Sequence, residues 1–285
     1  MSTLKIAIQK SGRLNEDSLQ LLKECGISID HRNAQLKATA RNFPLEVFYL
    51  RNGDIPQYLE DGVVDIAILG ENTLIEKGEN LPIVERLGFS KCKVSLAVPK
   101  DVEYTGLSYF EGKRIATTYT NTLDKFLKEK NIKASYHKIA GSVEIAPNIG
   151  LADGICDIVS SGGTLFANGL KEAEVMFWSE AVLTKSPVLS DDKQALLDKL
   201  QFRIQSILKG RAYRYVLLNA PNDKVNAIIK VIPGMKSPTV LPLAQAGWSS
   251  IHTVIPKDKF WEIIDELKTL GAEGILTTEI EKMVF

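Results

Sequence analysis

The part of this sequence best suited to bind a phosphorylated ligand is the glycine-containing stretch at residues 160–164. It reads Ser-Ser-Gly-Gly-Thr, and it follows an apolar run and precedes a helical pattern. The backbone N–H groups at the glycines, the hydroxyl groups and the start of the helix can all donate to an anion. Because the stretch lacks the lysine of a Walker A loop, two interpretations stay open: a phosphate-binding loop, or an ordinary turn between a strand and a helix.

Asp157 lies within the apolar run that leads into this stretch. A carboxylate in a buried strand is unfavourable unless it is paired or faces a cleft. Asp157 is therefore expected to be either a ligand for substrate hydroxyl groups or a structural hydrogen-bond acceptor.

Cationic side chains follow the first two predicted strands. Lys10 and Arg13 flank a glycine, and Arg51 begins the stretch Arg-Asn-Gly-Asp. Ligands of open α/β sheets bind at the carboxyl ends of the strands, so these cations predict contacts to phosphates or to a nucleotide. The alternative is that both stretches are solvent-exposed turns, and Asp54 is expected to be a helix cap.

Cysteine and histidine usage argues against a metal ion held by a protein cage. The chain has three cysteines, odd in number and far apart, and only three scattered histidines. This is neither a disulfide framework nor a zinc-binding spacing, and it favours a reducing cytoplasm. Cys92 lies between two lysines, which can lower the pKa of a thiol, but the alternating pattern of residues 92–98 favours a half-buried packing residue.

The charge balance excludes broad surfaces that bind polyanions. The 285 residues carry 35 Lys and Arg against 35 Asp and Glu, whereas nucleic-acid and anionic-membrane surfaces need a basic surplus. No apolar stretch approaches a membrane span of about 20 residues, and the start of the chain lacks the long apolar run of a secretion signal. We therefore expect a cytoplasmic protein with no nucleic-acid or membrane partner.

The first two hundred residues alternate β-branched runs with amphipathic helical patterns, which is typical of βαβ units around a parallel sheet. Strands are expected at residues 4–8, 45–50 and 63–69. One helix is expected to begin with Asn15 as its N-cap and to end at Gly26. A second is expected to begin at residues 54–56 and to end at Gly62.

A short internal repeat indicates two similar α/β lobes. Residues 59–66 (LEDGVVDI) recur as residues 151–158 (LADGICDI), and a glycine follows five residues after the second Asp of each copy. The repeat aligns Asp65 with Asp157, and it predicts a helix-ending glycine, a buried strand and a glycine-containing turn in each lobe. Two such lobes would face each other across a cleft, with these turns at its edges. Chance similarity between common strand–helix patterns is the alternative.

After residue 190 the pattern changes to that of a separate module. A long helix is expected at residues 191–209, followed by the order strand, helix, strand, strand, helix, strand. The expected strands are residues 213–218, 239–243, 249–255 and 274–278, and the expected helices are residues 223–231 and 258–270. This βαββαβ order is ferredoxin-like. The module has no cluster of catalytic side chains, so a regulatory or assembly role is expected.

Together these residues resemble the long form of the ATP phosphoribosyltransferase family, which catalyses the first step of histidine biosynthesis. The residues that match the family signature are Glu144, Gly150, Ala152, Ile155, Asp157, Ile158, Ser161, Gly162, Thr164 and Leu165. Further matches, at residues 7–14, 54–56, 62–65, 168–170, 237–239, 271–272 and 280–283, extend the resemblance over the whole chain. In the phosphate loop, Gly163 stands where alanine is usual.

The resemblance implies an α/β fold of two lobes like those of periplasmic binding proteins around a cleft, with a C-terminal ferredoxin-like domain. Lobe I would comprise residues 1–90 and 180–218, on the ATP side. Lobe II would comprise residues 91–179, and the regulatory domain residues 219–285.

The resemblance also implies a reaction in which N1 of ATP attacks the anomeric carbon of phosphoribosyl pyrophosphate (PRPP), giving phosphoribosyl-ATP and pyrophosphate. Such catalysis needs positioning and electrostatic stabilisation rather than a nucleophilic triad. The catalytic candidates are Arg51 and Asp157. The candidates for binding PRPP are Glu144, Asp157, Ser161, Gly162, Gly163 and Thr164, and those for binding ATP are Lys10, Gly12, Arg13, Arg51, Gly70 and Glu71. Mg²⁺ would be held mainly by substrate and water.

Feedback inhibition by L-histidine is a further implication, together with a homodimer that passes to a homohexamer under inhibition. The candidates for binding histidine are Asn219, Thr239 and Gly274. Some relatives carry an acidic residue at the position of Asn219, so Asp223 or a neighbour is an alternative contact for the amino group of the inhibitor.

Three rival functions are weighed against this resemblance. A solute-binding protein shares the two-lobed fold, but the missing export signal and the 160–164 stretch argue against it. A catalytic or regulatory subunit that depends on a partner is disfavoured because the C-terminal module is present. A different phosphoribosyltransferase is disfavoured by the match from Glu144 to Leu165.

Overall fold

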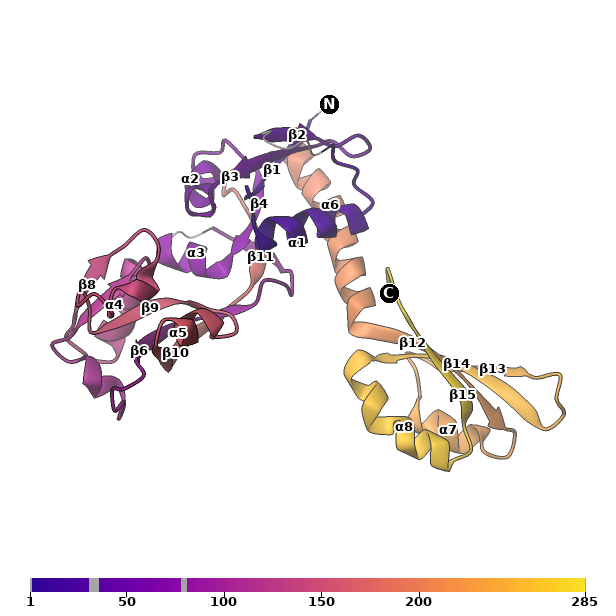
Figure 1. Cartoon of the computed structure of the whole chain (residues 1–285). Helices are drawn as coiled ribbons and strands as arrows, with labels where there is room; N and C mark the ends of the chain where they lie inside the picture. Colours follow the sequence, from indigo (N-terminus) through magenta and orange to yellow (C-terminus); the bar gives the residue numbers. More distant parts are fainter. Residues whose placement is uncertain (1, 31–35, 78–80, 285) are drawn as a thin grey trace. The chain divides into compact units, whose positions relative to one another are not determined.

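The structure, a computed structural model, describes residues 2–30, 36–77 and 81–284 (Figure 1). The chain divides into two compact units, Met1–Asp198 and Lys199–Phe285. Helix α6 (Asp191–Ala212) begins in the first unit and ends in the second. Within the described residues, no helix is both long and apolar enough to span a membrane.

The sheet of lobe I runs in the order β2-β3-β1-β4-β11-β5, and its strands β3, β1 and β4 are parallel. The carboxyl ends of these three strands therefore lie side by side at one edge. The strand bounds are β1 (Leu4–Gln9), β2 (Lys37–Thr39), β3 (Leu45–Leu50), β4 (Ile66–Gly70), β5 (Ile83–Arg86) and β11 (Ala181–Lys185). The expected strands at 4–8 and 45–50 are confirmed, and β4 begins three residues later than expected.

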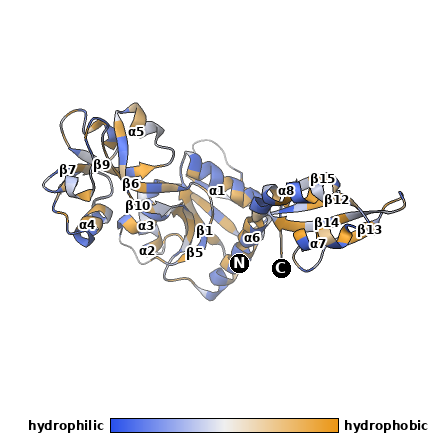
Figure 2. Cartoon of the chain, turned by 90° about the horizontal axis from the view of Figure 1, so that it is seen from below, coloured by the Kyte–Doolittle hydropathy of each residue, from blue (hydrophilic) through white to orange (hydrophobic). Residues whose placement is uncertain are grey.

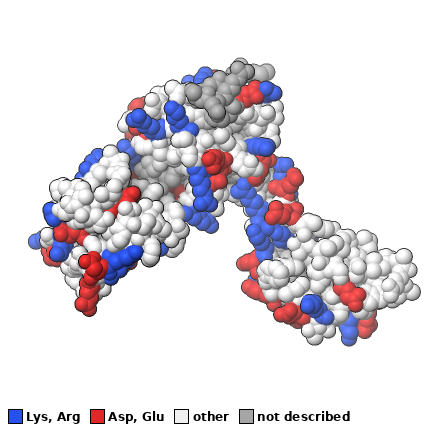
Figure 3. Space-filling model, viewed as in Figure 1, with Lys and Arg blue, Asp and Glu red and all other residues white. Residues whose placement is uncertain are grey.

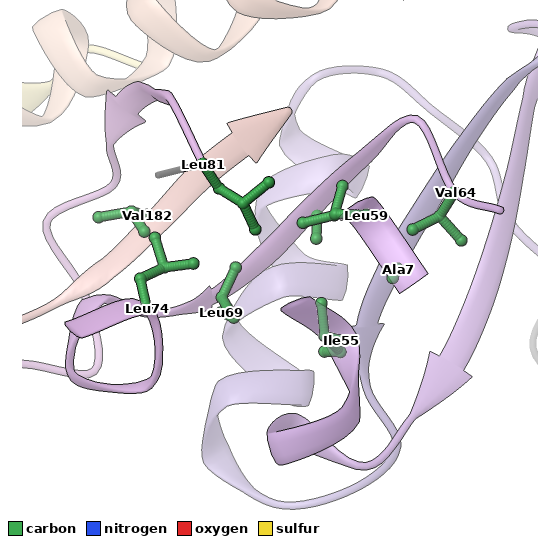
Figure 4. Packing of buried hydrophobic residues seen from close by; sticks show 9 residues of the cluster. Ala7, Ile55, Leu59, Val64, Leu69, Leu74, Leu81 and Val182 are labelled. Atoms are coloured by element: carbon green, nitrogen blue, oxygen red, sulfur yellow. The ribbon is translucent and has the colours of Figure 1, made fainter. Parts of the chain in front are cut away.

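Helices α1 (Arg13–Glu24), α2 (Ile55–Glu60) and α3 (Glu71–Lys77) connect these strands. Figure 2 shows orange and blue residues along α1, as expected of a helix with one buried and one exposed face. Side chains of α2, α3 and β4 meet in an apolar core (Figure 4), and burying each leucine or isoleucine there stabilises the fold by about 1.5–3 kcal/mol. The labelled members of this core are Ala7, Ile55, Leu59, Val64, Leu69, Leu74, Leu81 and Val182.

The start of α1 differs from the expectation. Gly12, with a φ of 85°, precedes the first helical residue, Arg13, so the helix begins two residues before Asn15. The Asn15 side chain is buried, and its amide donates to the Gln9 carbonyl at 2.6 Å. The expected N-cap is therefore wrong, because Asn15 instead fixes the turn that joins β1 to the helix.

The sheet of lobe II runs in the order β10-β6-β9-β7-β8, with β9, β7 and β8 parallel. The strands are β6 (Cys92–Pro99), β7 (Arg114–Thr117), β8 (Ser135–Lys138), β9 (Gly154–Val159) and β10 (Leu170–Ser179). The helices and 3₁₀ turns are η2 (Leu107–Phe110), α4 (Thr120–Glu129), η3 (Val143–Ile145) and α5 (Gly163–Ala167). The 160–164 stretch thus joins β9 to α5, as the pattern predicts.

The two lobes share a strand arrangement, but the repeat in the sequence does not follow it. The residues that correspond in the structure are offset by four positions from those that the repeat pairs. Asp65 donates its N–H to the Lys5 carbonyl at 2.9 Å and accepts the Lys5 N–H at 2.8 Å. Asp153 makes the same pair of bonds with Arg114, at 2.7 and 2.8 Å. The structural counterpart of Asp65 is therefore Asp153, and not Asp157.

Strand pairing gives the same alignment. Ile66 lies opposite Ile6, and Gly154 lies opposite Ile115, so counting along β4 and β9 places Asp157 at the position of Leu69. Gly154 is consequently the first residue of β9 and does not end a helix. The position has no room for a side chain, because a Cβ on Gly154 would lie 2.9 Å from the Ala97 carbonyl oxygen.

The second unit has a sheet in the order β13-β14-β12-β15, with antiparallel neighbours throughout. Its elements are β12 (Tyr213–Pro221), α7 (Val225–Val231), β13 (Thr239–Pro242), β14 (Trp248–Pro256), η4 (Lys257–Lys259), α8 (Phe260–Thr269) and β15 (Glu273–Glu279). This order confirms the ferredoxin-like arrangement. Residue 219, where the regulatory domain is expected to begin, lies inside β12, so the sheet starts before it.

Charged side chains of both signs are interspersed on the face of each unit seen in Figure 3. Among the residues coloured in this view, neither unit presents a continuous basic surface. A surface of this kind differs from the basic surplus that broad polyanion-binding surfaces need.

Replacing Asp65 with alanine should lower the free energy of unfolding by about 3 kcal/mol, since it leaves Lys193 and the Lys5 N–H without their acceptor. The Lys193 ammonium lies 2.8 Å from the Asp65 carboxylate, which is 6% exposed. Asp61→Ala is the matched control, because Asp61 is exposed and accepts a bond from Gln57 on the same helix surface. Urea unfolding measures both variants, and equal losses would contradict the role given to Asp65.

Candidate active site

The residues expected to bind PRPP gather around one cavity of about 300 Å³ in lobe II. They come from η3, from the end of β9 and from the turn into α5. The predicted residues in its lining are Glu144, Asp157, Ser161, Gly162, Gly163 and Thr164, and the lining also includes Ser160 and Ile158. Residues separated by up to twenty positions in the sequence are therefore brought to one concave surface.

The backbone conformation of the turn requires only one of its two glycines to be glycine. Gly162 has a φ of 78°, in the left-handed region that side chains disfavour, and it lies at the N-cap of α5. Gly163 has no such requirement, because a Cβ there would meet only the Ser161 hydroxyl, at 3.7 Å. An alanine at position 163 thus fits this backbone. The first N–H groups of α5 have no acceptor within the helix, and they point out of its start.

Asp157 lies near the end of β9, and its half-buried side chain lines this cavity. Burial, and to a smaller extent the charge of Glu144, raise the pKa of Asp157 to about 6, although the N–H of Ile158 donates to the carboxylate at 2.8 Å and opposes the shift. The side chain makes no ion pair within the described residues. With a pKa of about 6 this carboxylate is mostly ionised at pH 7, and in that form it can accept hydrogen bonds from hydroxyl groups in the cavity.

Glu144 lies on η3 and is half-buried. Glu144 and Asp157 line the same cavity, and the charge of Glu144 contributes to the raised pKa of Asp157. Ser142 begins this turn with a φ of 51°, a left-handed conformation that is uncommon for a residue with a side chain. The backbone therefore bends sharply just before the residue that reaches the cavity.

The residues expected on the ATP side lie at the adjacent ends of β3, β1 and β4. The Lys10 N–H donates to the Leu50 carbonyl at 2.8 Å, which places Lys10 beside Arg51. Both side chains are exposed, and neither forms an ion pair with a described residue. Gly70 ends the neighbouring strand β4. These strand ends offer two free cations to an anionic ligand.

Gly12 and Arg13 lie at the start of α1, next to this group. The Arg13 side chain is 83% exposed and has a weak contact with Asp17, at 3.8 Å. Such an exposed pair contributes little to stability, about 0–1 kcal/mol. Arg13 is accordingly available to a ligand. Asp54 lies at the N-cap position of α2 but makes no side-chain capping bond, so its expected capping role is not fulfilled.

Glu71 is less available than Lys10 or Arg51. Its carboxylate is 12% exposed and accepts two hydrogen bonds from the Arg86 guanidinium, one of them at 2.7 Å. Arg86 also lies 3.5 Å from Glu180. The Glu71 N–H donates to the Glu180 carbonyl at 3.0 Å, so the carboxylate and the N–H of Glu71 are both already bonded within lobe I.

A buried polar group that the sequence analysis did not identify connects the two lobes. The Asn72 amide donates to the Tyr119 hydroxyl at 2.9 Å, and its oxygen accepts from Ser179 at 2.9 Å. Burial, and then the charge of Asp157, raise the pKa of Tyr119, so this hydroxyl lies in the electrostatic field of the cavity that contains Asp157. The one signal in the sequence is an asparagine two residues after the glycine that ends a buried strand, a pattern too common to be specific.

Cysteine activation and a metal cage find no support in the described residues. Burial raises the pKa of the Cys92 thiol, which agrees with the half-buried packing residue favoured above. Within residues 2–30, 36–77 and 81–284, no group of three or more His, Cys, Asp or Glu side chains is arranged to hold a metal ion.

The residues expected to bind histidine share one face of the sheet in the second unit. Asn219 lies opposite Ser250, and Thr239 opposite His252, so all four side chains project to the same side. The other face carries Val216, Leu218 and Ile251, which pack against α7 and α8. Gly274 lies beside Asn219, whose amide nitrogen is 3.4 Å from the position of a Cβ on that glycine. The two ring nitrogens of His252 form hydrogen bonds with the Tyr215 hydroxyl at 2.7 Å and with the Ser250 hydroxyl at 3.1 Å.

Known proteins resemble this chain over its whole length. The model of the HisG family, described as ATP phosphoribosyltransferase, matches residues 51–206, and that of the HisG C-terminal domain matches residues 210–282. The chain is 55% identical over 285 residues to the ATP phosphoribosyltransferase of Cytophaga hutchinsonii, covering 100% of both chains.

Solved structures give the same relationship. A chain of the ATP phosphoribosyl transferase (HisG:HisZ) complex from Thermotoga maritima has 32% sequence identity and a TM-score of 0.61, covering 71% of this chain and 99% of that one. A periplasmic sulfonate-binding protein from Methylobacillus flagellatus shares the fold, with a TM-score of 0.51 at 13% identity over 74% of this chain and 69% of that one. The predicted likeness of the lobes to periplasmic binding proteins is thus confirmed. On these matches, the chain belongs to the HisG family of ATP phosphoribosyltransferases and has the C-terminal domain of its long form.

Proposed function

We propose that lobe II holds PRPP through Asp157 and the loop at residues 161–164, and that the strand ends of lobe I hold ATP. The chain transfers the phosphoribosyl group of PRPP to N1 of ATP, which is the first step of histidine biosynthesis. One observation carries the assignment of the PRPP site. The same cavity is lined by Asp157, a carboxylate of raised pKa, and by a turn whose left-handed backbone at Gly162 requires glycine.

In this proposal, each part of the PRPP cavity meets a different part of the substrate. The N–H groups that follow Gly162, with the hydroxyls of Ser161 and Thr164, donate to the 5′-phosphate. Asp157 accepts hydrogen bonds from the ribose hydroxyls. This bonding is strong because half-burial leaves little water to compete for the carboxylate. Glu144 adds a second carboxylate on the same side of the sugar.

The reaction forms a bond between N1 of the adenine and the anomeric carbon, and the bond from that carbon to pyrophosphate breaks. The electron pair leaves with pyrophosphate, and positive charge develops on the ribose in the transition state. Asp157 stabilises this charge electrostatically, and Arg51 binds the phosphate charge from the side of lobe I. No described residue is needed as a covalent nucleophile, since alignment of the two substrates supplies the main rate enhancement.

ATP contacts are proposed for Lys10, Gly12, Arg13 and Arg51, with Gly70 and Glu71 forming the turn beside them. Support comes from the adjacency of Lys10 and Arg51 and from the exposure of both cations. The ion pair between Glu71 and Arg86 assigns its carboxylate a structural role, holding the turn after β4 in shape.

Mg²⁺ fits this site as an ion carried by the substrate. The donors present are the carboxylate oxygens of Glu144 and Asp157, which suit a hard cation but are too few for a cage, so phosphate and water would complete its shell. When bound, the ion would neutralise charge on the departing pyrophosphate.

The second unit is proposed to bind L-histidine at Asn219, Thr239 and Gly274, as a feedback inhibitor. Their support is the shared sheet face, which no helix of the unit covers among the described residues. This open face would also serve the assembly of homodimers into a homohexamer. We also propose a cytoplasmic location, in keeping with the free thiols of Cys92 and Cys156.

The activity is tested by mixing the protein with ATP, PRPP and Mg²⁺ and following the absorbance of the N1-substituted adenine. In that assay Gly162→Ala should raise the KM for PRPP about tenfold, because a side chain in the left-handed conformation costs about 1–2 kcal/mol. Gly163→Ala is the control and should stay within about twofold, since its Cβ meets no obstacle. Equal effects of the two variants, or no product from the wild type, would reject the proposal.

The pH profile should reveal the ionisation of Asp157. As the pH falls through about 6, the carboxylate is protonated and loses acceptor capacity, so kcat/KM for PRPP should fall. Because the phosphates of PRPP titrate in the same range, Asp157→Asn is the necessary comparison, and it should show low activity with a weaker acid limb. An unchanged acid limb in Asp157→Asn would contradict this assignment.

The same substitution separates function from stability. The folded pKa of Asp157 is raised, so its stabilising contribution is present at low pH and is lost as the pH rises through about 6. At pH 7.5 Asp157→Asn should therefore unfold at a higher urea concentration than the wild type. A variant that loses both activity and stability would indicate a structural acceptor instead.

Inhibition by histidine should depend on the exposed face of the second unit. Thr239→Val removes a hydrogen-bonding hydroxyl and should raise the histidine concentration for half-inhibition about tenfold, with kcat unchanged. Thr278→Val, on strand β15 at the opposite edge of the sheet and also exposed, is the matched control. Equal inhibition of all three proteins would place the effector site elsewhere.

A further inference from the structure

Glu76, on helix α3 of lobe I, binds the first turn of helix α4 in lobe II. Its carboxylate accepts the N–H groups of Asn121 and Thr122, at 3.1 and 3.0 Å, and lies 3.4 Å from the Thr120 hydroxyl. The Asn121 amide also donates to the Glu76 carbonyl at 2.9 Å. The side chain and the backbone of one residue thus engage the same helix start, 45 residues further along the chain.

Helix α4 has no capping side chain of its own. Tyr119 occupies its N-cap position and makes no side-chain capping bond. The first N–H groups of a helix lack intrahelical acceptors and carry partial positive charge, so an anionic side chain is favourable there. Glu76 supplies that acceptor from the other lobe.

A second bond joins the same two helices close to both proposed substrate sites. Asn72, two residues after Gly70, donates to Tyr119, the residue before α4. The Tyr119 N–H donates to the Thr117 hydroxyl at 2.8 Å, and this hydroxyl donates to the carbonyl of Cys156 at 2.7 Å. Cys156 directly precedes Asp157. A continuous series of hydrogen bonds therefore runs from the end of β4 to the strand that carries Asp157.

We propose that Glu76 is a positioning residue for the transfer reaction: by capping α4 from lobe I, it fixes the separation and angle at which the Asp157 cavity faces the strand ends of lobe I. The proposal rests on the assignment of PRPP to lobe II and ATP to lobe I made above. Glu76 lines neither the PRPP cavity nor the strand ends, so it acts on the relation between the two sites and not on either one.

This placement predicts a separation between binding and catalysis. The PRPP cavity is lined wholly by residues 144–165 of lobe II, so it keeps its shape when the contact between α3 and α4 is lost. Bond formation between N1 and the anomeric carbon requires both substrates in one alignment, and a displacement of about 1 Å can lower the rate about a hundredfold. Loss of Glu76 should therefore lower kcat while leaving PRPP binding intact.

The experiment compares Glu76→Ala and Glu76→Gln with Glu129→Gln in the full-length protein. Glu129 is exposed at the opposite end of α4, so Glu129→Gln controls for the loss of a carboxylate that is close to this helix but does not cap its start. We expect kcat to fall about tenfold or more in Glu76→Ala and less in Glu76→Gln, which keeps one acceptor oxygen, with the Kd for PRPP within twofold of the wild type in both. Glu129→Gln should match the wild type.

Amide hydrogen exchange provides a readout at the cap itself. Exchange at Asn121 and Thr122 should become faster in Glu76→Ala while the PRPP loop at residues 161–164 keeps its exchange rates. A kcat within twofold of the control, or a parallel loss of PRPP affinity and kcat, would overturn the proposal. Failure of the PRPP assignment is recognised separately, by Gly162→Ala leaving the KM for PRPP unchanged.

Discussion

The partial burial of one carboxylate, Asp157, is the constraint on which the proposed site depends. At the matching position of lobe I the chain has Leu69, a fully buried apolar side chain. In lobe II the strand instead carries a group whose ionised form is disfavoured by burial, and its pKa rises accordingly. A carboxylate in such a place binds hydroxyl groups strongly, because the surrounding water is reduced. The two lobes thus share a strand arrangement and differ at the position where the chemistry is proposed.

The anions of both substrates must be bound by few groups, because the chain as a whole has no net charge. Lobe II offers backbone N–H groups and hydroxyls around one cavity, and lobe I offers exposed cations at adjacent strand ends. Directional donors of this kind recognise a phosphate at close range without a broad basic surface. The contact of α3 with α4 then decides how these two sets of donors face each other.

Features encoded locally were predictable from the sequence, and those that depend on distant partners were not. The alternating residues 45–50 form β3 with these bounds, and the PRPP candidates line one cavity because they lie within a short stretch of chain. The repeat misaligned the lobes by four residues: it matched the Asp–Gly spacing, whereas the bond to the neighbouring strand is made by Asp65 in one lobe and Asp153 in the other. The partners of Glu71 and Glu76 lie 15 and 45 residues away, and no local pattern marks them.

The division of substrates between the lobes is the central claim, and hydrogen exchange with each substrate alone tests it most directly. PRPP with Mg²⁺ should slow amide exchange at residues 157–165 and leave residues 10–13 and 51–53 unchanged. ATP with Mg²⁺ should slow exchange at residues 10–13 and 51–53. The account would be contradicted if PRPP slowed exchange at the strand ends of lobe I and did not slow it at residues 157–165.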